Sequence, residues 1–308
     1  MNKLLTIFFA ACIACSMATP VAATQTPKSL VIIDTGISSQ VSSLKASLID
    51  EACFIEFGKC PNGLNNMFGL GAATIDPSLV KDRTLSHGTQ MTSVAVQIDP
   101  ALKVVMIRVV GVSAKGFANT YRTGVITKAL EWVNQNASRL NVGAVSISLG
   151  RTYSQSQCPI ESELQQRIID LAKKDIPVIA AAGNGSSRVK IDYPACIPQV
   201  ISIGATDTRY SSRGTVGWIY PVMAISNSSA DLDYFTLGRF ETTNVFGEKS
   251  VQLGTSVSTV AFAAQLVKLQ NGGIEAKDLL SVINSNLENA YRSMSEVSKK
   301  HYSILKQG

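Results

Sequence analysis

Short apolar runs alternate with longer amphipathic stretches from about residue 30 to about residue 287. The first run, residues 30–33, is continuous and rich in β-branched residues, which is typical of a strand covered on both faces. Four similar runs follow, at 104–110, 144–149, 178–182 and 200–203. Between the runs, apolar residues recur at helical spacing, as in 120–136 and 160–173. This alternation predicts an α/β fold: a three-layer, doubly wound, mainly parallel sheet.

Outside these runs the pattern changes. The Ser- and Asn-rich segment 226–233 predicts a long surface loop, and the apolar pattern fades beyond residue 288 into a polar tail. No internal repeat and no linker-like stretch divides the chain. We therefore expect residues 24–308 to form a single domain.

The first residues are typical of a secretory signal peptide. Lys3 precedes an apolar stretch over residues 4–14, and small residues at 21–23 form a cleavage site. We therefore expect residues 1–23 to be a signal peptide and the protein to be exported, to a periplasm or to the medium. Lipoprotein processing at Cys15 is an alternative. The apolar stretch is about half as long as a membrane-spanning helix, so we expect no transmembrane segment.

Composition and charge narrow the class of protein. Of the 308 residues, 45% are hydrophobic and 16% are charged, which is enough apolar material for a sizeable core and excludes a disordered chain. The formal net charge of +6 is spread along the chain without a run of like charges. This distribution argues against a nucleic-acid partner.

The cysteines predict disulfides. Six are present, and removal of residues 1–23 takes away two of them, leaving an even number for an oxidising compartment. Four cysteines allow three pairings. We favour Cys53–Cys60, which closes a short loop, and Cys158–Cys196, which ties two distant loops. A zinc site is the alternative, but it needs closely spaced Cys and His pairs, and the chain has only two histidines.

Four polar segments at the ends of the predicted elements could carry chemistry. Asp34 ends the first strand and His87 opens a helical stretch; Asn184 follows a strand between two glycines, and Ser256 precedes a long helix. Each has an ordinary explanation taken alone, such as a turn residue, an exposed histidine, an Asn-Gly turn or a helix N-cap. The carboxyl ends of parallel strands, however, share one edge of the sheet, which would bring these groups together.

Taken in order, these segments resemble the subtilisin-like serine proteases, the subtilases. The matching segments are 31–36 (VIIDTG), 87–89 (HGT), 148–150 (SLG), 182–184 (AGN), 193–195 (YPA), 200–205 (VISIGA) and 254–256 (GTS). The resemblance covers roughly residues 29–285. It implies a subtilisin-like fold and a serine endopeptidase that acts on peptide or protein substrates; we expect a monomer.

The resemblance also implies roles for individual residues. Ser256 would attack the scissile carbonyl, His87 would take its proton, and Asp34 would orient and stabilise the imidazole. Asn184, with the Ser256 backbone N–H, would hold the oxyanion.

Substrate binding is implied at three places. An extended peptide would be gripped on one side by Ser148, Leu149 and Gly150 and on the other by the stretch around Gly116. Gly183, with its neighbours, would line the first specificity pocket. Because the neighbouring residues carry no charge, we expect a preference for uncharged residues before the cut.

The sequence departs from the family pattern at several positions. Val260 stands where a proline usually shapes the helix after the nucleophile, and Gln90 stands where a second histidine is common. About ten residues separate the expected cleavage site from Asp34, so no N-terminal propeptide domain is evident. Many members bind calcium, but no acidic loop cluster can be assigned to it. We therefore expect no required cofactor and assign no metal ligand.

Two alternatives remain open. The protein could be a catalytically weak or inactive subtilase-like binding or regulatory protein, as the altered helix after Ser256 suggests. It could also be an α/β-hydrolase esterase that uses Ser256, Asp278 and His301, although Ser258 stands where that motif requires glycine.

Overall fold

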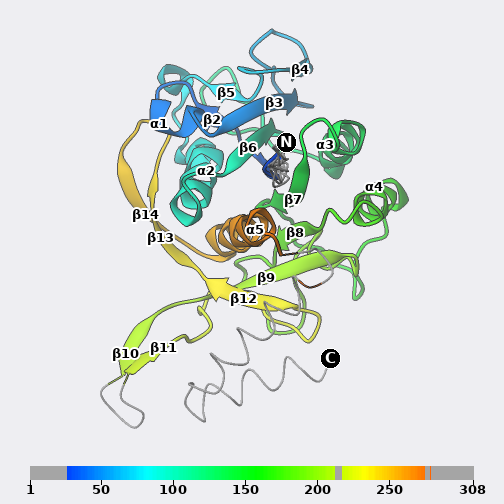
Figure 1. Ribbon diagram of the computed structural model, residues 1–308, viewed down its shortest axis with the longest axis vertical. Helices are drawn as coiled ribbons and strands as arrows, with labels where there is room; N and C mark the ends of the chain where they lie inside the picture. The colour runs from blue at the N-terminus through cyan, green and yellow to red at the C-terminus, as the bar shows by residue number, and fades with distance from the viewer. Residues whose placement is uncertain (1–25, 212–216, 275–277, 279–308) are drawn as a thin grey trace, which may run out of the picture.

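The computed structural model describes residues 26–211, 217–274 and 278 (Figure 1). Within these residues, eight strands form one sheet. In spatial order they are β12 (Tyr234–Leu237), β9 (Val200–Thr206), β8 (Val178–Ala181), β7 (Val142–Ile147), β1 (Ser29–Asp34), β6 (Lys103–Arg108), β3 (Leu48–Phe54) and β4 (Asn66–Phe68). All neighbouring pairs are parallel except β3 and β4. The predicted mainly parallel sheet is therefore confirmed.

Helices cover both faces of the sheet, as Figure 1 shows. They are α2 (His87–Ile98) and α5 (Thr255–Asn271) on one face, and α3 (Thr123–Asn136) and α4 (Ser162–Ala172) on the other. Successive residues of β1 serve the two faces in turn. Leu30 and Ile32 pack with α2 and α5, whereas Val31 and Ile33 pack with α3 and α4. This is why the strand reads as a continuous apolar run and why the fold has three layers.

Smaller elements complete the described chain. The helical ones are α1 (Ser42–Lys45), η1 (Pro77–Leu79) and η2 (Arg83–Ser86). The strand pairs are β2 (Ile37–Ser38) with β5 (Thr74–Ile75), β10 (Arg209–Ser211) with β11 (Gly217–Ile219), and β13 (Arg239–Thr243) with β14 (Lys249–Leu253).

The sequence pattern did not predict β3, because two acidic residues interrupt its apolar run. Asp50 and Glu51 are 7% and 3% exposed, yet both have partners. Asp50 pairs with Arg139 at 2.7 Å, and the Glu51 carboxylate accepts a hydrogen bond from the Ala73 backbone at 2.8 Å. A buried charge is tolerated when it is paired in this way, so β3 can lie within the sheet.

The segment 226–233 connects β11 and β12 without regular structure, as expected of a loop, but its first part is not on the surface. Ser226 and Asn227 are 0% and 1% exposed. The side chain of Asn227 satisfies backbone groups of the loop after β8, which explains why a polar residue is buried here.

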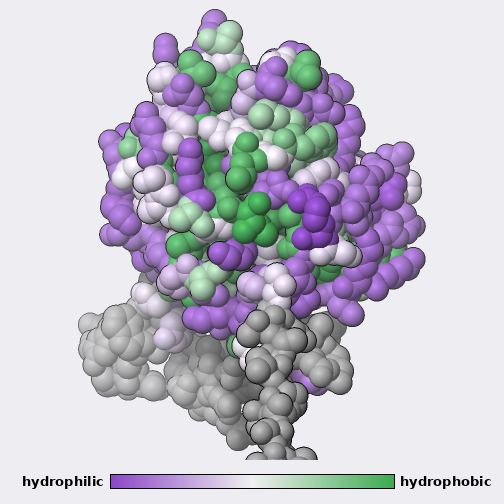
Figure 2. Space-filling model, turned by 45° about the horizontal axis from the view of Figure 1, so that its top comes forward, coloured by the Kyte–Doolittle hydropathy of each residue, from purple (hydrophilic) through white to green (hydrophobic). Residues whose placement is uncertain are grey.

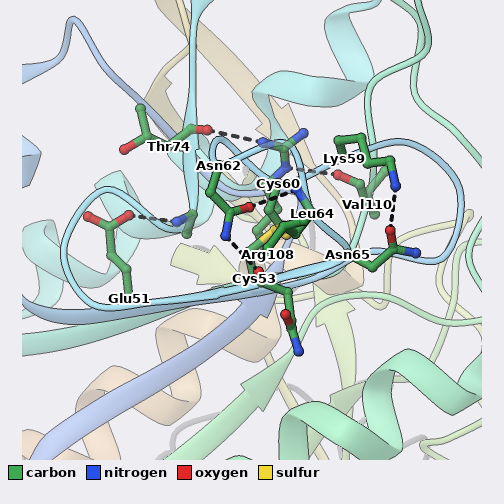
Figure 3. The surroundings of a disulfide bond; sticks show 12 residues. Glu51, Cys53, Lys59, Cys60, Asn62, Leu64, Asn65, Thr74, Arg108 and Val110 are labelled. Atoms are coloured by element: carbon green, nitrogen blue, oxygen red, sulfur yellow. Dashed lines mark hydrogen bonds between the residues drawn. A yellow bond between two sulfur atoms is a disulfide. The ribbon is translucent and has the colours of Figure 1, made fainter.

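Both predicted disulfides are present. Cys53 on β3 bonds to Cys60 in the loop that follows (Figure 3), and Cys158 bonds to Cys196 across 38 positions of sequence. Near the first disulfide, the Arg108 guanidinium donates to the carbonyls of Thr74 and Val110, and burial lowers its pKa to about 10.

Several predictions lie outside the described residues: the signal peptide over 1–23, lipoprotein processing at Cys15, and His301 of the esterase alternative. In the part of the chain that the structure does describe, the helices are all too short or too polar to cross a membrane. Figure 2 shows a face on which hydrophobic side chains gather centrally, with hydrophilic side chains around them.

Candidate active site

The four candidate residues come from four different elements. Asp34 is the last residue of β1, and His87 is the first of α2. Asn184 lies in the loop after β8, and Ser256 lies in the first turn of α5. They lie at the carboxyl ends of parallel strands or at the starts of the helices packed there, as expected for ligand sites in open parallel sheets.

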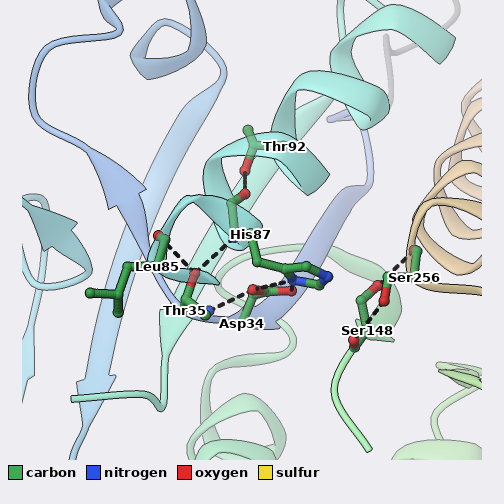
Figure 4. Close-up of polar contacts among 8 residues, drawn as sticks. Asp34, Thr35, Leu85, His87, Thr92, Ser148 and Ser256 are labelled. Carbon is green, nitrogen blue, oxygen red and sulfur yellow. Dashed lines mark hydrogen bonds and ion pairs between the residues drawn. The ribbon is translucent and has the colours of Figure 1, made fainter. Parts of the chain in front are cut away.

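Asp34 and His87 form a closely bonded pair (Figure 4). The Nδ1 atom of His87 lies 2.8 Å and 2.9 Å from the two carboxylate oxygens of Asp34. The Asp34 side chain is fully buried and that of His87 is 25% exposed. Burial of the ring favours its neutral form, but the charge and hydrogen bond of Asp34 together raise the pKa of His87 above its ordinary value. With its Nδ1–H donated to Asp34, the neutral ring carries its lone pair on Nε2.

The start of α2 is fastened to the end of β1. The Thr35 hydroxyl accepts a hydrogen bond from the Gly88 backbone at 2.8 Å and donates one to the Leu85 carbonyl at 3.2 Å. A Cβ atom at residue 88 would stand 2.2 Å from the carbonyl oxygen of Gly36. Only glycine at 88 allows this approach, so it sets the distance between the strand that carries Asp34 and the helix that carries His87.

Ser256 lies on the free side of the imidazole, and Figure 4 shows the His87 ring pointing toward it. Its hydroxyl donates to the carbonyl of Ser148 at 3.2 Å rather than to His87. The Ser148 hydroxyl in turn donates to the carbonyl of Ser256 at 2.9 Å. The structure therefore brings the three predicted catalytic residues together, with the serine hydroxyl turned to a neighbouring carbonyl.

The amide of Asn184 is oriented by the residue before Ser256. Its Oδ1 atom accepts hydrogen bonds from the backbone N–H and the hydroxyl of Thr255, at 2.9 Å and 3.1 Å. These two donors fix which end of the amide is oxygen. The Nδ2 group has no hydrogen-bond partner among the described residues, so both of its N–H donors are available at the start of α5.

A cavity of about 680 Å³ opens next to His87. Leu149 and Gly150 line it, as predicted for one substrate-binding edge. Residues 118–121 also line it, whereas Gly116 is buried against residues 79–81, where its carbonyl accepts a hydrogen bond from the backbone of Lys81 at 2.8 Å. Gly116 is thus not among the residues that line this cavity, and its role in substrate binding stays a prediction. An antiparallel β-bridge between residues 112 and 118 closes the turn that contains Gly116, and no local sequence signal predicted this bridge.

Residues from the β13–β14 hairpin also line the cavity and were not predicted. They are Asn244, Ser250 and Gln252. Gln90, one of the departures from the family pattern, donates to the Ser250 hydroxyl at 3.1 Å and so ties α2 to this hairpin. Val260, the other departure, is fully buried in the core within an unbroken α5.

The surroundings of Gly183 differ from the prediction. A Cβ atom at this residue would lie 2.2 Å from Oδ2 of Asp192. The expectation of an uncharged pocket considered only the residues of the Gly183 loop, and Asp192 arrives from a later loop. The predicted preference for uncharged side chains therefore left one nearby charge out of account, and the preference itself stays a prediction.

Within the described ranges, no three His, Cys, Asp or Glu side chains come close enough to hold a metal ion. Whether the protein requires calcium stays a prediction.

The fold and this edge of the sheet define an α/β protein that carries a buried carboxylate, an imidazole bonded to it and a serine at the start of a helix. The chain belongs to the subtilase family (peptidase S8), whose model matches residues 28–299.

Similar proteins agree with this assignment. The chain is 31% identical over 198 residues to Subtilisin DY of Bacillus licheniformis, covering 63% of this chain and 62% of that protein. It is 28% identical over 177 residues to Subtilisin Savinase of Lederbergia lenta, covering 56% of each. The chain thus spans a little over half the length of Savinase.

Among solved structures, the S41 psychrophilic protease superposes with a TM-score of 0.62 at 19% identity, over 82% of this chain and 81% of that one. Sphericase gives a TM-score of 0.60 at 18% identity, over 84% of each chain. These likenesses show that the fold is subtilisin-like.

Proposed function

We propose that this protein is an exported serine endopeptidase in which Ser256, His87 and Asp34 cut peptide bonds. The observation that carries the proposal is the contact of His87 Nδ1 with both oxygens of the buried Asp34, on a ring that points toward Ser256.

The mechanism follows from this arrangement. Rotation about the Ser256 side chain turns the hydroxyl from the Ser148 carbonyl to His87 Nε2. The hydroxyl oxygen attacks the scissile carbonyl while Nε2 takes its proton, and Asp34 stabilises the imidazolium that results. The Nδ2 group of Asn184 and the Ser256 backbone N–H donate to the oxyanion. The imidazolium then protonates the leaving amine, and water repeats the sequence on the acyl-enzyme.

The test is covalent labelling with a fluorophosphonate, which reacts only with an activated serine. We expect the purified protein to be modified at Ser256, as located by peptide mass mapping. His87→Ala should suppress labelling by at least about 10³-fold, because the general base is lost. His301→Ala is the matched control: it removes the other histidine and should leave labelling unchanged.

One observation favours the second candidate, a subtilase-like protein that binds peptides without cutting them: the Ser256 hydroxyl is bonded to Ser148 rather than to His87. A folded protein that resists labelling would support this candidate over the protease. Loss of labelling in His301→Ala would instead support the esterase.

We further propose that the protein is exported and needs no cofactor for the chemical step. Two disulfides are typical of an oxidising compartment. The mass of the N-terminal peptide in the mature protein distinguishes cleavage after residue 23 from lipid attachment at Cys15. Labelling in the presence of EDTA should equal labelling without it.

A further inference from the structure

The substrate residue that precedes the cut must lie between two segments of this protein; this inference rests on the proposed function. The scissile carbonyl has to reach both Ser256 and the amide of Asn184. The segments beside these groups, 148–150 and 182–184, follow the neighbouring parallel strands β7 and β8. The side chain next to the reacting carbonyl is therefore directed to the space bordered by Gly150 and Gly183.

Asp192 joins these two segments. Its backbone N–H donates to the Ala182 carbonyl at 2.8 Å, and the next residue, Tyr193, pairs with Arg151 through bonds of 2.9 Å and 3.0 Å. A Cβ atom on Gly183 would stand 2.2 Å from Asp192 Oδ2, and one on Gly150 would stand 3.5 Å from Asp192 Cβ. The absence of side chains at both glycines thus leaves Asp192 as the nearest side chain between the segments.

The Asp192 carboxylate is held in place by an amide. Oδ1 lies 3.2 Å from Nδ2 of the buried Asn227, which also donates to the Ala182 carbonyl at 2.9 Å. The same side chain accepts from the backbone of Gly185 and Ser187, at 3.0 Å and 2.9 Å. One amide therefore fixes both the carboxylate and the loop that carries Asn184.

No cation neutralises this carboxylate within the part of the chain that is described. Oδ2 has no hydrogen-bond or ion-pair partner there. The nearby Arg151 bonds to Glu161 at 2.7 Å and lies over the Tyr193 ring, and Lys190 donates to the Tyr153 carbonyl. Burial raises the pKa of Asp192, and Asn227 and Lys190 oppose this only in part. A half-buried carboxylate in this position favours an incoming cation.

We propose that Asp192 selects substrates with arginine or lysine immediately before the cleaved bond. The guanidinium or ammonium group would meet Oδ2, and its aliphatic stem would pass the two glycines, where no side chain obstructs it. A specificity for basic residues is the opposite of what the loop sequence alone suggested.

The experiment compares fluorogenic peptides that differ only at the residue before the cut: arginine, its uncharged near-isostere citrulline, and leucine. We expect kcat/KM for the arginine peptide to exceed that for the citrulline peptide by about 10- to 100-fold, the usual range for a hydrogen bond to a charged group. Asp192→Asn should abolish this ratio, and Asp192→Glu should keep most of it. Asp231→Asn, which removes an exposed carboxylate, should leave the ratio unchanged.

A second readout does not depend on turnover. Benzamidine should bind Ser256→Ala at least about 10-fold more tightly than it binds the double variant with Asp192→Asn. The proposal is overturned if benzamidine binds the two variants equally, or if the unaltered protein cleaves the arginine and citrulline peptides equally.

Fluorophosphonate labelling separates this failure from that of the proposed function. A labelled protein without a preference for arginine overturns the role of Asp192 and leaves the protease intact. A folded protein that neither labels nor cleaves overturns the protease itself. If Asp192→Asn does not fold, the arginine-to-citrulline ratio of the unaltered protein decides the question.

Discussion

Ser148 and Ser256 exchange two hydrogen bonds. The Ser148 hydroxyl donates to the Ser256 carbonyl at 2.9 Å, and the Ser256 hydroxyl donates to the Ser148 carbonyl at 3.2 Å. The first bond fastens the end of β7 to the first turn of α5. The second holds the proposed nucleophile until it turns to His87. The sheet therefore positions the serine through a residue that also lies on the predicted substrate edge.

Ser148→Ala should lower kcat about three- to tenfold, because a neutral hydrogen bond contributes about 0.5–1.5 kcal/mol to holding that first turn. Ser146→Ala, two residues earlier on β7, is the matched control. Its buried hydroxyl has no hydrogen-bond partner among the residues that the structure describes, so its removal should leave kcat unchanged and not reduce stability. Steady-state kinetics and urea unfolding measure both effects. Equal effects of the two variants would refute the positioning role.

Activity should rise with pH through the raised pKa of His87, since the general base must be neutral. The acid limb of kcat/KM should therefore lie above the ordinary histidine pKa of 6.5. The free energy of unfolding changes in the opposite direction with pH. The pairing of protonated His87 with Asp34 contributes fully to stability below pH 6.5, the ordinary histidine pKa. This contribution is lost as the pH rises through the raised pKa of His87 in the folded protein.

Asp34→Asn removes the charge that raises this pKa and leaves the burial that lowers it, so the pKa of His87 should fall. NMR titration in a Ser256→Ala background measures it, with His301→Ala to assign the only other histidine. An unchanged pKa in Asp34→Asn would contradict the prediction.

Gly88→Ala should move α2 away from β1, because the new Cβ would collide with the backbone oxygen of Gly36. We expect a loss of about 1–3 kcal/mol in the free energy of unfolding, as for overpacking, and at least a tenfold loss of kcat. Gly124→Ala in α3 is the control, because its Cβ would enter open space and alanine is the better helix former. Chemical denaturation and kinetics of the two variants provide the comparison.

Asn184→Ala should lower kcat by about 10²–10³-fold with little change in KM, because the lost donor acts on the oxyanion and not on the bound substrate. Ser186→Gly alters the same loop, at a residue with φ of 58°, without removing the amide. It should retain nearly full kcat. A large rise in KM for Asn184→Ala would place this residue in ground-state binding instead.

The two disulfides should contribute unequally to stability. On the loop-entropy model, the Cys158–Cys196 bond, with a separation of 38, is worth about 4 kcal/mol, against about 2 kcal/mol for Cys53–Cys60, with a separation of 7. Replacing each pair by serines and measuring urea unfolding tests this order. A larger loss from the short loop would show that native-state contacts outweigh chain entropy.

Much of the fold could be predicted because buried parallel strands must be apolar on both faces. That constraint produces the continuous runs that marked β1, β6, β7, β8 and β9. The apolar pattern did not reveal β3, because Asp50 and Glu51 are buried in that strand. Their partners are Arg139 and the Ala73 backbone. Such partners are distant in sequence, so no local pattern announces them.

The sequence by itself determined the alternation of strands and helices, the cysteines available for pairing, and the order of Asp34, His87, Asn184 and Ser256. Each of these properties depends on residues that are close together in the sequence, so it can be recognised without knowing the fold. Only the tertiary structure decided that Gly116 packs against residues 79–81, that Ser256 is bonded to Ser148, and that Asp192 reaches Gly183. The physical reason is that these contacts join residues that are far apart in the sequence. Such residues meet only when the sheet assembles, and the register of the strands and the paths of the loops then decide which of them touch.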